Sequence, residues 1–369
     1  MAHDEGGGIN LWELQLAARN HGMPLEALRH AITPPGLHYL LIHYDVPVVD
    51  VETWKLAVDG AVARPFALTL DDLRARPSED VVVTMECAGN GRALLEPHVV
   101  SQPWLRDAVG TARWRGVPLR VVLDEAGGAD DAVEVLFTGL DRGIEGGSAQ
   151  DYQRSLSLDE ARRDEVLLAY EMNGAPLPAQ HGFPVRLVVP GWYGMTSVKW
   201  LGRITLLLEP FGGYQQSAAY RRRRSEEETG EPVTRILPRS LMVPPGIPEF
   251  LTRERTVEPG TCVLEGRAWS GLAPVVRVEV TVDGGGTWSD AELGDEGLGR
   301  WAWRPWHFDW EARAGPPRRL GSRATDADGN VQRDEPAWNL GGYENNAVQW
   351  LDVTVAWSKR AALGSSRTG

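Results

Sequence analysis

The sequence predicts an α+β domain over residues 1–235, followed by an all-β, immunoglobulin-like sandwich over residues 236–369. In the first part, short helical and strand-like patterns follow one another without regular alternation, which favours an α+β arrangement over a doubly wound sheet. Pro244, Pro245 and Pro248 mark a connector. After it, about a hundred residues read as short strands separated by turns, which is typical of a sandwich.

The helices expected in the first part come from apolar spacing. Residues 9–30 carry apolar side chains at helical intervals, with an interruption near Gly22 and Pro24. Shorter helices are expected over residues 70–73 and 119–126. Strands are expected where β-branched and apolar residues run together. These runs cover residues 54–59, 81–86, 133–137 and 185–189.

The second part alternates apolar and polar side chains over residues 275–282, as a half-buried strand does, and a glycine-rich turn follows at residues 283–286. Further strands fit residues 301–306, 319–324 and 348–355. Before the connector, residues 221–228 hold four arginines and then three glutamates. Such block charge predicts a solvated loop.

Composition limits the classes of function. The length of 369 residues suits two domains. The net charge of −13 argues against nucleic acid as a partner, and no apolar run is long enough to predict a membrane span. The first eight residues are acidic and glycine-rich, unlike a secretory signal, so a cytoplasmic location is expected, or a periplasmic one if a leader has been removed.

The two cysteines, Cys87 and Cys262, do not make a disulfide scaffold. No Cys-x-x-Cys motif occurs, which excludes a zinc ribbon and a cysteine-held iron–sulfur cluster. Cys87 follows the strand predicted to end at Glu86 and precedes small, turn-forming residues. A thiolate fixed there, with Arg92 nearby, would suit a soft metal or act as a nucleophile. Core packing is the ordinary alternative for such a cysteine.

Residues 86–92, Glu-Cys-Ala-Gly-Asn-x-Arg, resemble the molybdenum-binding loop of the sulfite oxidase family. Three later strings resemble the same family in the same order: residues 169–178, 181–191 and 197–201. The resemblance runs from about His38 to about Val355. It implies the sulfite oxidase fold, with a C-terminal immunoglobulin-like domain through which the protein forms a homodimer.

The resemblance also implies a cofactor, molybdenum on molybdopterin, a pyranopterin dithiolene. Cys87 matches the metal ligand. The positions that match pterin-holding residues are His43, Asp141, His181, Arg186, Ser197 and Lys199. Arginine and lysine would neutralise a phosphate and serine would donate a hydrogen bond, while histidine and aspartate can bind pterin edges. Taken singly, the same residues suit turns, a plain loop histidine, or a lysine lying along a strand.

Arg92, Trp104 and Tyr220 match the family's substrate-pocket arginine, tryptophan and tyrosine. Two further pocket arginines of the family align with Leu41 and Gly341, which are uncharged. We therefore expect weaker binding of sulfite, or a substrate with less negative charge, because charge-assisted hydrogen bonds are lost. The arginine run that starts at residue 221 follows Tyr220 directly and would supply compensating charge if it faced the pocket.

The function implied is a molybdenum-dependent oxidoreductase that transfers an oxo group to sulfite, giving sulfate. About 35 residues precede the matching region, too few for the family's haem domain, so no haem is expected in this chain. Electrons would pass to oxygen or to a separate protein such as a cytochrome.

Three alternatives remain at this point. The first is oxo transfer to or from a sulfoxide or another oxoanion. The second is a cysteine-nucleophile enzyme that pairs Cys87 with His43 or His181. The third is a non-catalytic protein that binds partners through its tryptophan-rich second half.

Overall fold

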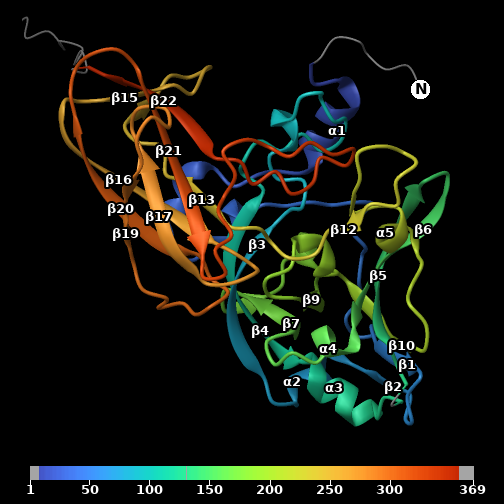
Figure 1. The fold of residues 1–369 in the computed structure, drawn as a ribbon. Coiled ribbons are helices and arrows are strands. Elements are labelled where there is room, and N and C mark those ends of the chain that lie inside the picture. Colours follow the sequence, from blue (N-terminus) through green and yellow to red (C-terminus); the bar gives the residue numbers. More distant parts are fainter. Residues whose placement is uncertain (1–7, 130, 357–369) are drawn as a thin grey trace, which may run out of the picture.

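The computed structural model describes residues 8–129 and 131–356. Figure 1 shows the strands of the C-terminal part, coloured orange to red, gathered on one side of the mixed α and β elements of the first part. The expected fold class is confirmed in both parts. The domain boundary after residue 235 stays a prediction. The first seven residues, which bear on the expected location, lie outside the described residues.

One five-stranded sheet of the first part has the order β2-β1-β10-β5-β6. Its strands are β2 (Phe66–Leu68), β1 (Leu56–Gly60), β10 (Leu201–Leu207), β5 (Glu134–Glu145) and β6 (Ser148–Ser157). The pairing of β1 with β10 is parallel and the other pairings are antiparallel. This mixture suits an α+β domain rather than a doubly wound sheet.

The second sheet carries the strand that leads to Cys87. Its strands are β3 (Glu79–Glu86), β4 (Val109–Pro118), β7 (Leu167–Met172), β8 (Ala175–Pro176) and β9 (Arg186–Val188). The last five residues of β3 are all buried, which explains why its valine-rich sequence does not alternate. Glu86, at its end, pairs with Val109 of β4.

The helices of the described residues are short, and none of them is long and apolar enough to cross a membrane. They are α1 (Leu11–Arg19), η1 (Leu25–Arg29), η2 (Pro35–Leu37), α2 (Leu70–Arg74), η3 (Arg92–Leu94), α3 (Leu119–Ala126), α4 (Leu158–Ala161), η4 (Ala179–His181), η5 (Gly194–Thr196) and α5 (Tyr214–Ser217). The expected helix over residues 70–73 is confirmed as α2, and that over 119–126 as α3.

The expected helix over residues 9–30 is two helices, α1 and η1, separated where Gly22 and Pro24 interrupt the pattern. Its apolar spacing was misleading, because Leu11 and Leu14 are exposed while Glu13 is fully buried. Glu13 closes a capping box with Asn10 and contacts His98. Polar contacts, rather than an apolar face, therefore orient α1.

The C-terminal part is a sandwich of two sheets, ordered β13-β16-β20-β19 and β14-β15-β22-β21-β17-β18. The strands are β13 (Arg239–Met242), β14 (Ile247–Pro248), β15 (Arg255–Val257), β16 (Gly260–Trp269), β17 (Val275–Thr281), β18 (Ser289–Asp290), β19 (Glu292–Leu293), β20 (Arg304–Ala312), β21 (Arg318–Asp326) and β22 (Gln349–Val355). Residues of both sheets share one apolar core, which includes Leu264, Trp306, Val278 and Leu320.

The strand expected over residues 301–306 begins instead at Arg304. Trp301 and Trp303 turn toward the first part and bond to β3. The Thr84 N–H donates to the Trp301 carbonyl at 2.9 Å, and the Trp303 N–H donates to Thr84 Oγ1 at 2.8 Å. A long-range contact with β3 therefore shortens this strand.

The arginine run is only partly a solvated loop. Arg221–Arg222 forms β11, which pairs with β12 (Glu231–Pro232) in a short hairpin. The Arg221 guanidinium donates to the Thr229 and Gly230 carbonyls at 2.7 and 2.6 Å. These bonds stabilise the hairpin and direct the Arg221 guanidinium toward its backbone carbonyls.

Candidate active site

The loop after β3 fixes Cys87 by backbone hydrogen bonds. The Cys87 N–H donates to the Ala108 carbonyl at 2.9 Å, and the Asn90 N–H donates to the Cys87 carbonyl at 3.0 Å. Gly91 has a φ of +92°, and a Cβ at this position would lie 2.8 Å from the Asn345 amide. Glycine is therefore required at position 91 for both conformation and space.

Cys87 lies where two cavities meet. One, called the rear cavity, is lined by residues including His38, His43, Asp141, His181, Arg186, Ser197 and Lys199. The other, called the front cavity, has a volume of about 300 Å³ and is lined by residues including Leu41, Arg92, Gln102 and Tyr343. Cys87, His43, Leu41 and Tyr220 line both. The folded chain thus brings all six predicted pterin-holding positions into one cavity together with Cys87. Their roles stay predictions.

The rear cavity gathers basic groups, and each disfavours the charged form of its neighbours. Burial and the nearby Arg186 lower the pKa of Lys199 to about 7. Burial, then His38, lowers the pKa of His181 to about 2, and burial, then Lys199, lowers that of His43 to about 3. Burial raises the pKa of Asp141 to about 6 despite the attraction of Lys199. An anion in this cavity would relieve the repulsion.

The lysine and the arginine of the rear cavity are held by backbone carbonyls. Lys199 Nζ donates to the Leu41 carbonyl at 2.7 Å. Arg186 donates to the carbonyls of His181 and Ser197 at 3.1 and 2.9 Å. Within residues 8–129 and 131–356, neither cation lies within ion-pair distance of a carboxylate. Both charges are therefore oriented by the chain yet left for another anion to neutralise.

These residues fit a phosphate-bearing pterin. Asp141 Oδ1 and His38 Nε2 are buried and have no hydrogen-bond partner among the described residues, as expected of groups aimed at a polar ligand. The described part of the chain holds no group of three or more His, Cys, Asp or Glu side chains placed to bind a metal. A metal at Cys87 would thus take its other ligands from a cofactor, as a dithiolene provides.

Among the described residues, two arginines line the front cavity: Arg92, which is buried, and Arg19, which is exposed. Arg92 Nε donates to the Gly341 carbonyl at 2.9 Å and Nη1 donates to Ser101 Oγ at 3.1 Å. The guanidinium lies 5.2 Å from the centre of the Tyr343 ring. Tyr220 Oη is 2.5 Å from His43 Nε2, and its ring lies 5.3 Å from that of Tyr343. Arg92 and Tyr220 therefore both line the front cavity, and their role toward a substrate stays a prediction.

Tyr343 is a pocket residue that the sequence did not reveal. A Cβ on Gly341 would overlap the Tyr343 ring, so this ring fills the space that a side chain at position 341 would need. The sequence offers only a weak indication of its role, because Tyr343 lies far along the chain from Cys87, two residues after Gly341. Leu41 lines both cavities. Neither position brings a cation to the front cavity.

Trp104 is placed beside the thiol rather than on a cavity wall. It is 3% exposed and packs with Cys87 and Ala108 in a small apolar cluster. Burial raises the pKa of the Cys87 thiol, while Arg92 and the Gly89 backbone oppose this rise. Trp104 thus forms part of the apolar packing around Cys87. Arg221 also does not line either cavity, because the β11–β12 hairpin holds it.

Two family models match the chain. Residues 43–215 match the oxidoreductase molybdopterin binding domain, and residues 238–357 match the Mo-co oxidoreductase dimerisation domain. Among solved structures, the sulfane dehydrogenase SoxCD from Paracoccus pantotrophus is similar, with a TM-score of 0.77 over 97% of this chain and 95% of that chain. Its sequence identity of 24% supports a shared fold.

Curated relatives extend the match. Mouse mitochondrial sulfite oxidase is 40% identical over 341 residues, which cover 88% of this chain and 62% of that protein. Nitrate reductase [NADH] 1 of Arabidopsis thaliana is 33% identical over 94% of this chain and 41% of that protein. Chicken sulfite oxidase is 38% identical over 86% of this chain and 72% of that protein. With this coverage and a molybdopterin-binding domain around Cys87, the chain belongs to the sulfite oxidase family of molybdopterin oxidoreductases.

Proposed function

We propose that this protein oxidises sulfite to sulfate by oxygen-atom transfer at a molybdenum centre ligated by Cys87. The position of Cys87 carries the proposal, because the thiol lines both the rear and the front cavity. A metal on this sulfur would stand where a cofactor held in one cavity meets a substrate entering the other. The cysteine-nucleophile alternative is less well supported, because burial raises the pKa of the thiol and depresses that of both candidate histidines.

The rear cavity would hold the pterin. Arg186 and Lys199 would neutralise its phosphate, and Asp141 and His181 would bind its polar edges. Ser197 Oγ already accepts a hydrogen bond from the Val189 N–H at 3.1 Å, which leaves its own proton to donate to the phosphate. When bound, the molybdenum cofactor supplies the two-electron oxygen-atom transfer.

Arg92 would orient the oxoanion. Its Nε and Nη1 are engaged with the chain, and within the described residues Nη2 donates no hydrogen bond. A Cβ on Gly89 would lie 2.6 Å from Nη2, so the glycine lets this group approach the loop of Cys87. Nη2 is therefore the part of Arg92 that is free to bind a substrate oxygen beside the metal ligand.

The net reaction consumes sulfite and water and releases sulfate, two protons and two electrons. The electrons would leave to a separate acceptor, either oxygen or a protein such as a cytochrome. We also infer a homodimer formed through the C-terminal domain, which the match to a dimerisation domain supports.

A less anionic sulfur compound, such as a sulfoxide, is the second candidate substrate. It is favoured by Leu41 and Gly341, the two uncharged positions that align with arginines of the family, and by the Tyr343 ring, which fills the space beside Gly341. A charge-assisted hydrogen bond contributes on the order of 1.5–3 kcal/mol. Two lost bonds therefore cost roughly 3–6 kcal/mol, or two to four powers of ten in sulfite affinity.

The test combines metal analysis with two assays on purified protein. We expect about one molybdenum per chain, with pterin, and sulfite oxidation by an artificial electron acceptor at a high KM. Reduction of a sulfoxide by a reduced dye, at a higher kcat/KM than sulfite oxidation, would favour the second candidate. A fully active, metal-free protein that is inactivated by alkylation of Cys87 would overturn both in favour of the nucleophile.

A further inference from the structure

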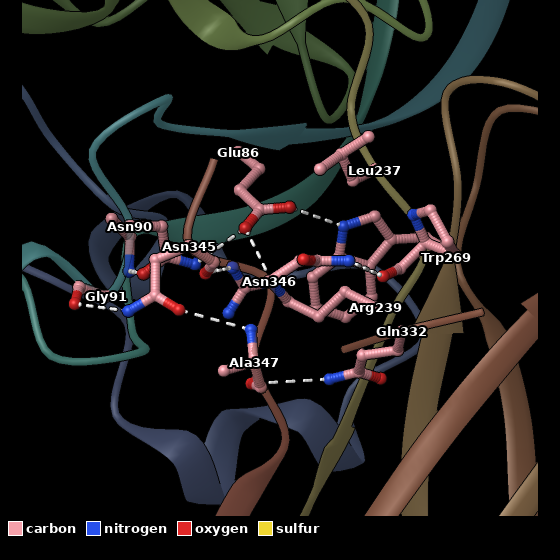
Figure 2. A network of polar contacts seen from close by, with 12 residues as sticks. Glu86, Asn90, Gly91, Leu237, Arg239, Trp269, Gln332, Asn345, Asn346 and Ala347 are labelled. Carbon is pink, nitrogen blue, oxygen red and sulfur yellow. Dashed lines mark hydrogen bonds and ion pairs between the residues drawn. The ribbon is translucent and has the colours of Figure 1, made fainter. Parts of the chain in front are cut away.

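Glu86 is the residue before the thiol, and its carboxylate is held from three sides (Figure 2). Asn90 of the loop donates to it at 3.0 Å, and the Trp269 indole N–H donates at 2.8 Å. Arg239 Nε forms an ion pair with it at 2.8 Å, and both side chains are only 1% exposed. Two of the three partners therefore come from the C-terminal domain.

The same domain also forms hydrogen bonds with the backbone of the loop. Arg239 donates to the Asn345 carbonyl, and the Asn345 side chain donates to the Gly91 carbonyl at 2.8 Å. The Glu344 N–H donates to the Ala88 carbonyl at 2.9 Å. Figure 2 shows the Arg239 guanidinium between Glu86 and the segment that carries Asn345. The C-terminal domain therefore contacts the loop around Cys87 at its start and along its length. We call the contacting residues Arg239, Trp269, Glu344 and Asn345, together with Glu86, the clamp.

Stability alone is a poor explanation for this ion pair. A buried pair gains little over well-packed apolar residues of similar size, because desolvation offsets the attraction. Glu86 and Arg239 line neither cavity, so a direct role toward substrate or pterin is also absent from the geometry. What distinguishes the pair is that Glu86 directly precedes Cys87 in the sequence.

We propose that the Glu86–Arg239 ion pair is a positioning device, through which the C-terminal domain sets the location and orientation of the Cys87 thiol for the metal. The inference rests on the proposed function only in taking Cys87 as the metal ligand, and it holds for either substrate. Glu86 and Arg239 are therefore positioning residues rather than catalytic ones.

The test uses cofactor-free full-length protein with Cys262→Ser, which leaves Cys87 as the one thiol of the chain. The rate of alkylation of Cys87 by iodoacetamide is measured over pH, and the pH-independent rate constants are compared, so that a changed thiol pKa does not enter. We expect Arg239→Met to raise this constant about tenfold, because the loop opens more readily. Arg239→Lys, which keeps the charge, should restore most of the wild-type behaviour.

The control is Arg255→Met. Arg255 forms a 2.6 Å ion pair with Glu26, which also joins the C-terminal domain to the first part, but neither residue belongs to the clamp. This variant should lose thermal stability while its alkylation constant stays at the wild-type value. Equal alkylation constants for Arg255→Met and Arg239→Met would overturn the proposal.

A double variant separates positioning from stability. Glu86→Leu/Arg239→Met removes both charges, and it should recover thermal stability relative to Arg239→Met. Its alkylation constant should nevertheless stay high, and loaded protein reduced to molybdenum(V) should show an altered electron paramagnetic resonance spectrum. If the alkylation constant and the electron paramagnetic resonance spectrum both returned to wild-type values, the pair would contribute only to packing and the proposal would be wrong. Because alkylation needs neither metal nor substrate, it tests the positioning of the Cys87 thiol separately from the proposed oxidation of sulfite.

Discussion

At Cys87, serine replaces a soft sulfur by a hard oxygen of nearly the same size. Cys87→Ser should therefore lose molybdenum and activity while remaining folded. Metal content, steady-state turnover and circular dichroism measure the three properties. Cys262→Ser is the matched control, because Cys262 lies on β16 outside both cavities, and it should keep metal and activity. Full turnover by Cys87→Ser would refute the ligand assignment.

The two uncharged pocket positions differ in what they allow. The sequence suggests restoring arginine at both, but an arginine at position 341 would collide with Tyr343, so Leu41 is the position to change. Leu41→Arg should lower the KM for sulfite roughly 10–100-fold, the worth of one charge-assisted hydrogen bond. Leu41→Gln is the control without charge and should change KM far less. A micromolar KM for sulfite in the wild type would contradict the argument.

Lys199 gives the cofactor-free protein a pH dependence. Its pKa falls from 10.5 to about 7 on folding, so the unfolded chain binds more protons between those values. The free energy of unfolding should rise with pH across this window, and the penalty should be complete below pH 7. Lys199→Met should be more stable than wild type near neutral pH and show a shallower rise. Urea denaturation at several pH values checks this, and parallel curves would contradict it.

Inorganic phosphate should act on the same cations. It should raise the melting temperature of cofactor-free wild type, because a bound anion relieves the repulsion between Lys199 and Arg186. In Lys199→Met the shift should be much smaller, whereas chloride at equal ionic strength should have little effect on either protein. Equal phosphate shifts in the two proteins would place the anion elsewhere.

At the scale of elements, β3 and its loop could be predicted because their signal is local, a β-branched run followed by turn residues. The six pterin-holding positions came from the resemblance, and the fold gathers them in one cavity. Tyr343 and Arg239 could not be predicted, since they reach the site from the other domain. The start of β20 was predicted wrongly for the same reason. Trp301 and Trp303 bond to Thr84 of β3, so the strand begins only at Arg304.

The bond between Trp303 and Thr84 provides a test at this scale. Thr84→Val keeps the shape of the side chain but leaves both the backbone N–H of Trp303 and the buried hydroxyl of Thr111 without their bonds to Thr84 Oγ1. The loss should be about 1–3 kcal/mol in the free energy of unfolding, measured by urea denaturation. Thr261→Val is the control, because Thr261 is exposed and bonds to Glu311 within one domain. Equal losses in the two variants would remove any special role for this contact.

For the whole molecule, we expect a homodimer of twice the 40.6 kDa chain mass. Four of the late tryptophans are not available for an interface. Trp269, Trp303, Trp306 and Trp310 are buried within one chain. The expectation now depends on the match to a dimerisation domain. Light scattering at micromolar concentration measures the mass, and a monomer would contradict the prediction.

The ion pair between Glu86 and Arg239 also bears on modularity. A polypeptide that stopped after residue 235 would lack Arg239 and Trp269, two of the three partners of the Glu86 carboxylate beside Cys87. Such a fragment is expected to fold poorly when it is produced alone. For the same reason, exchanging C-terminal domains between relatives would need a matching arginine and tryptophan as well as a matching linker. The two regions are therefore expected to be inherited and recombined as a single unit.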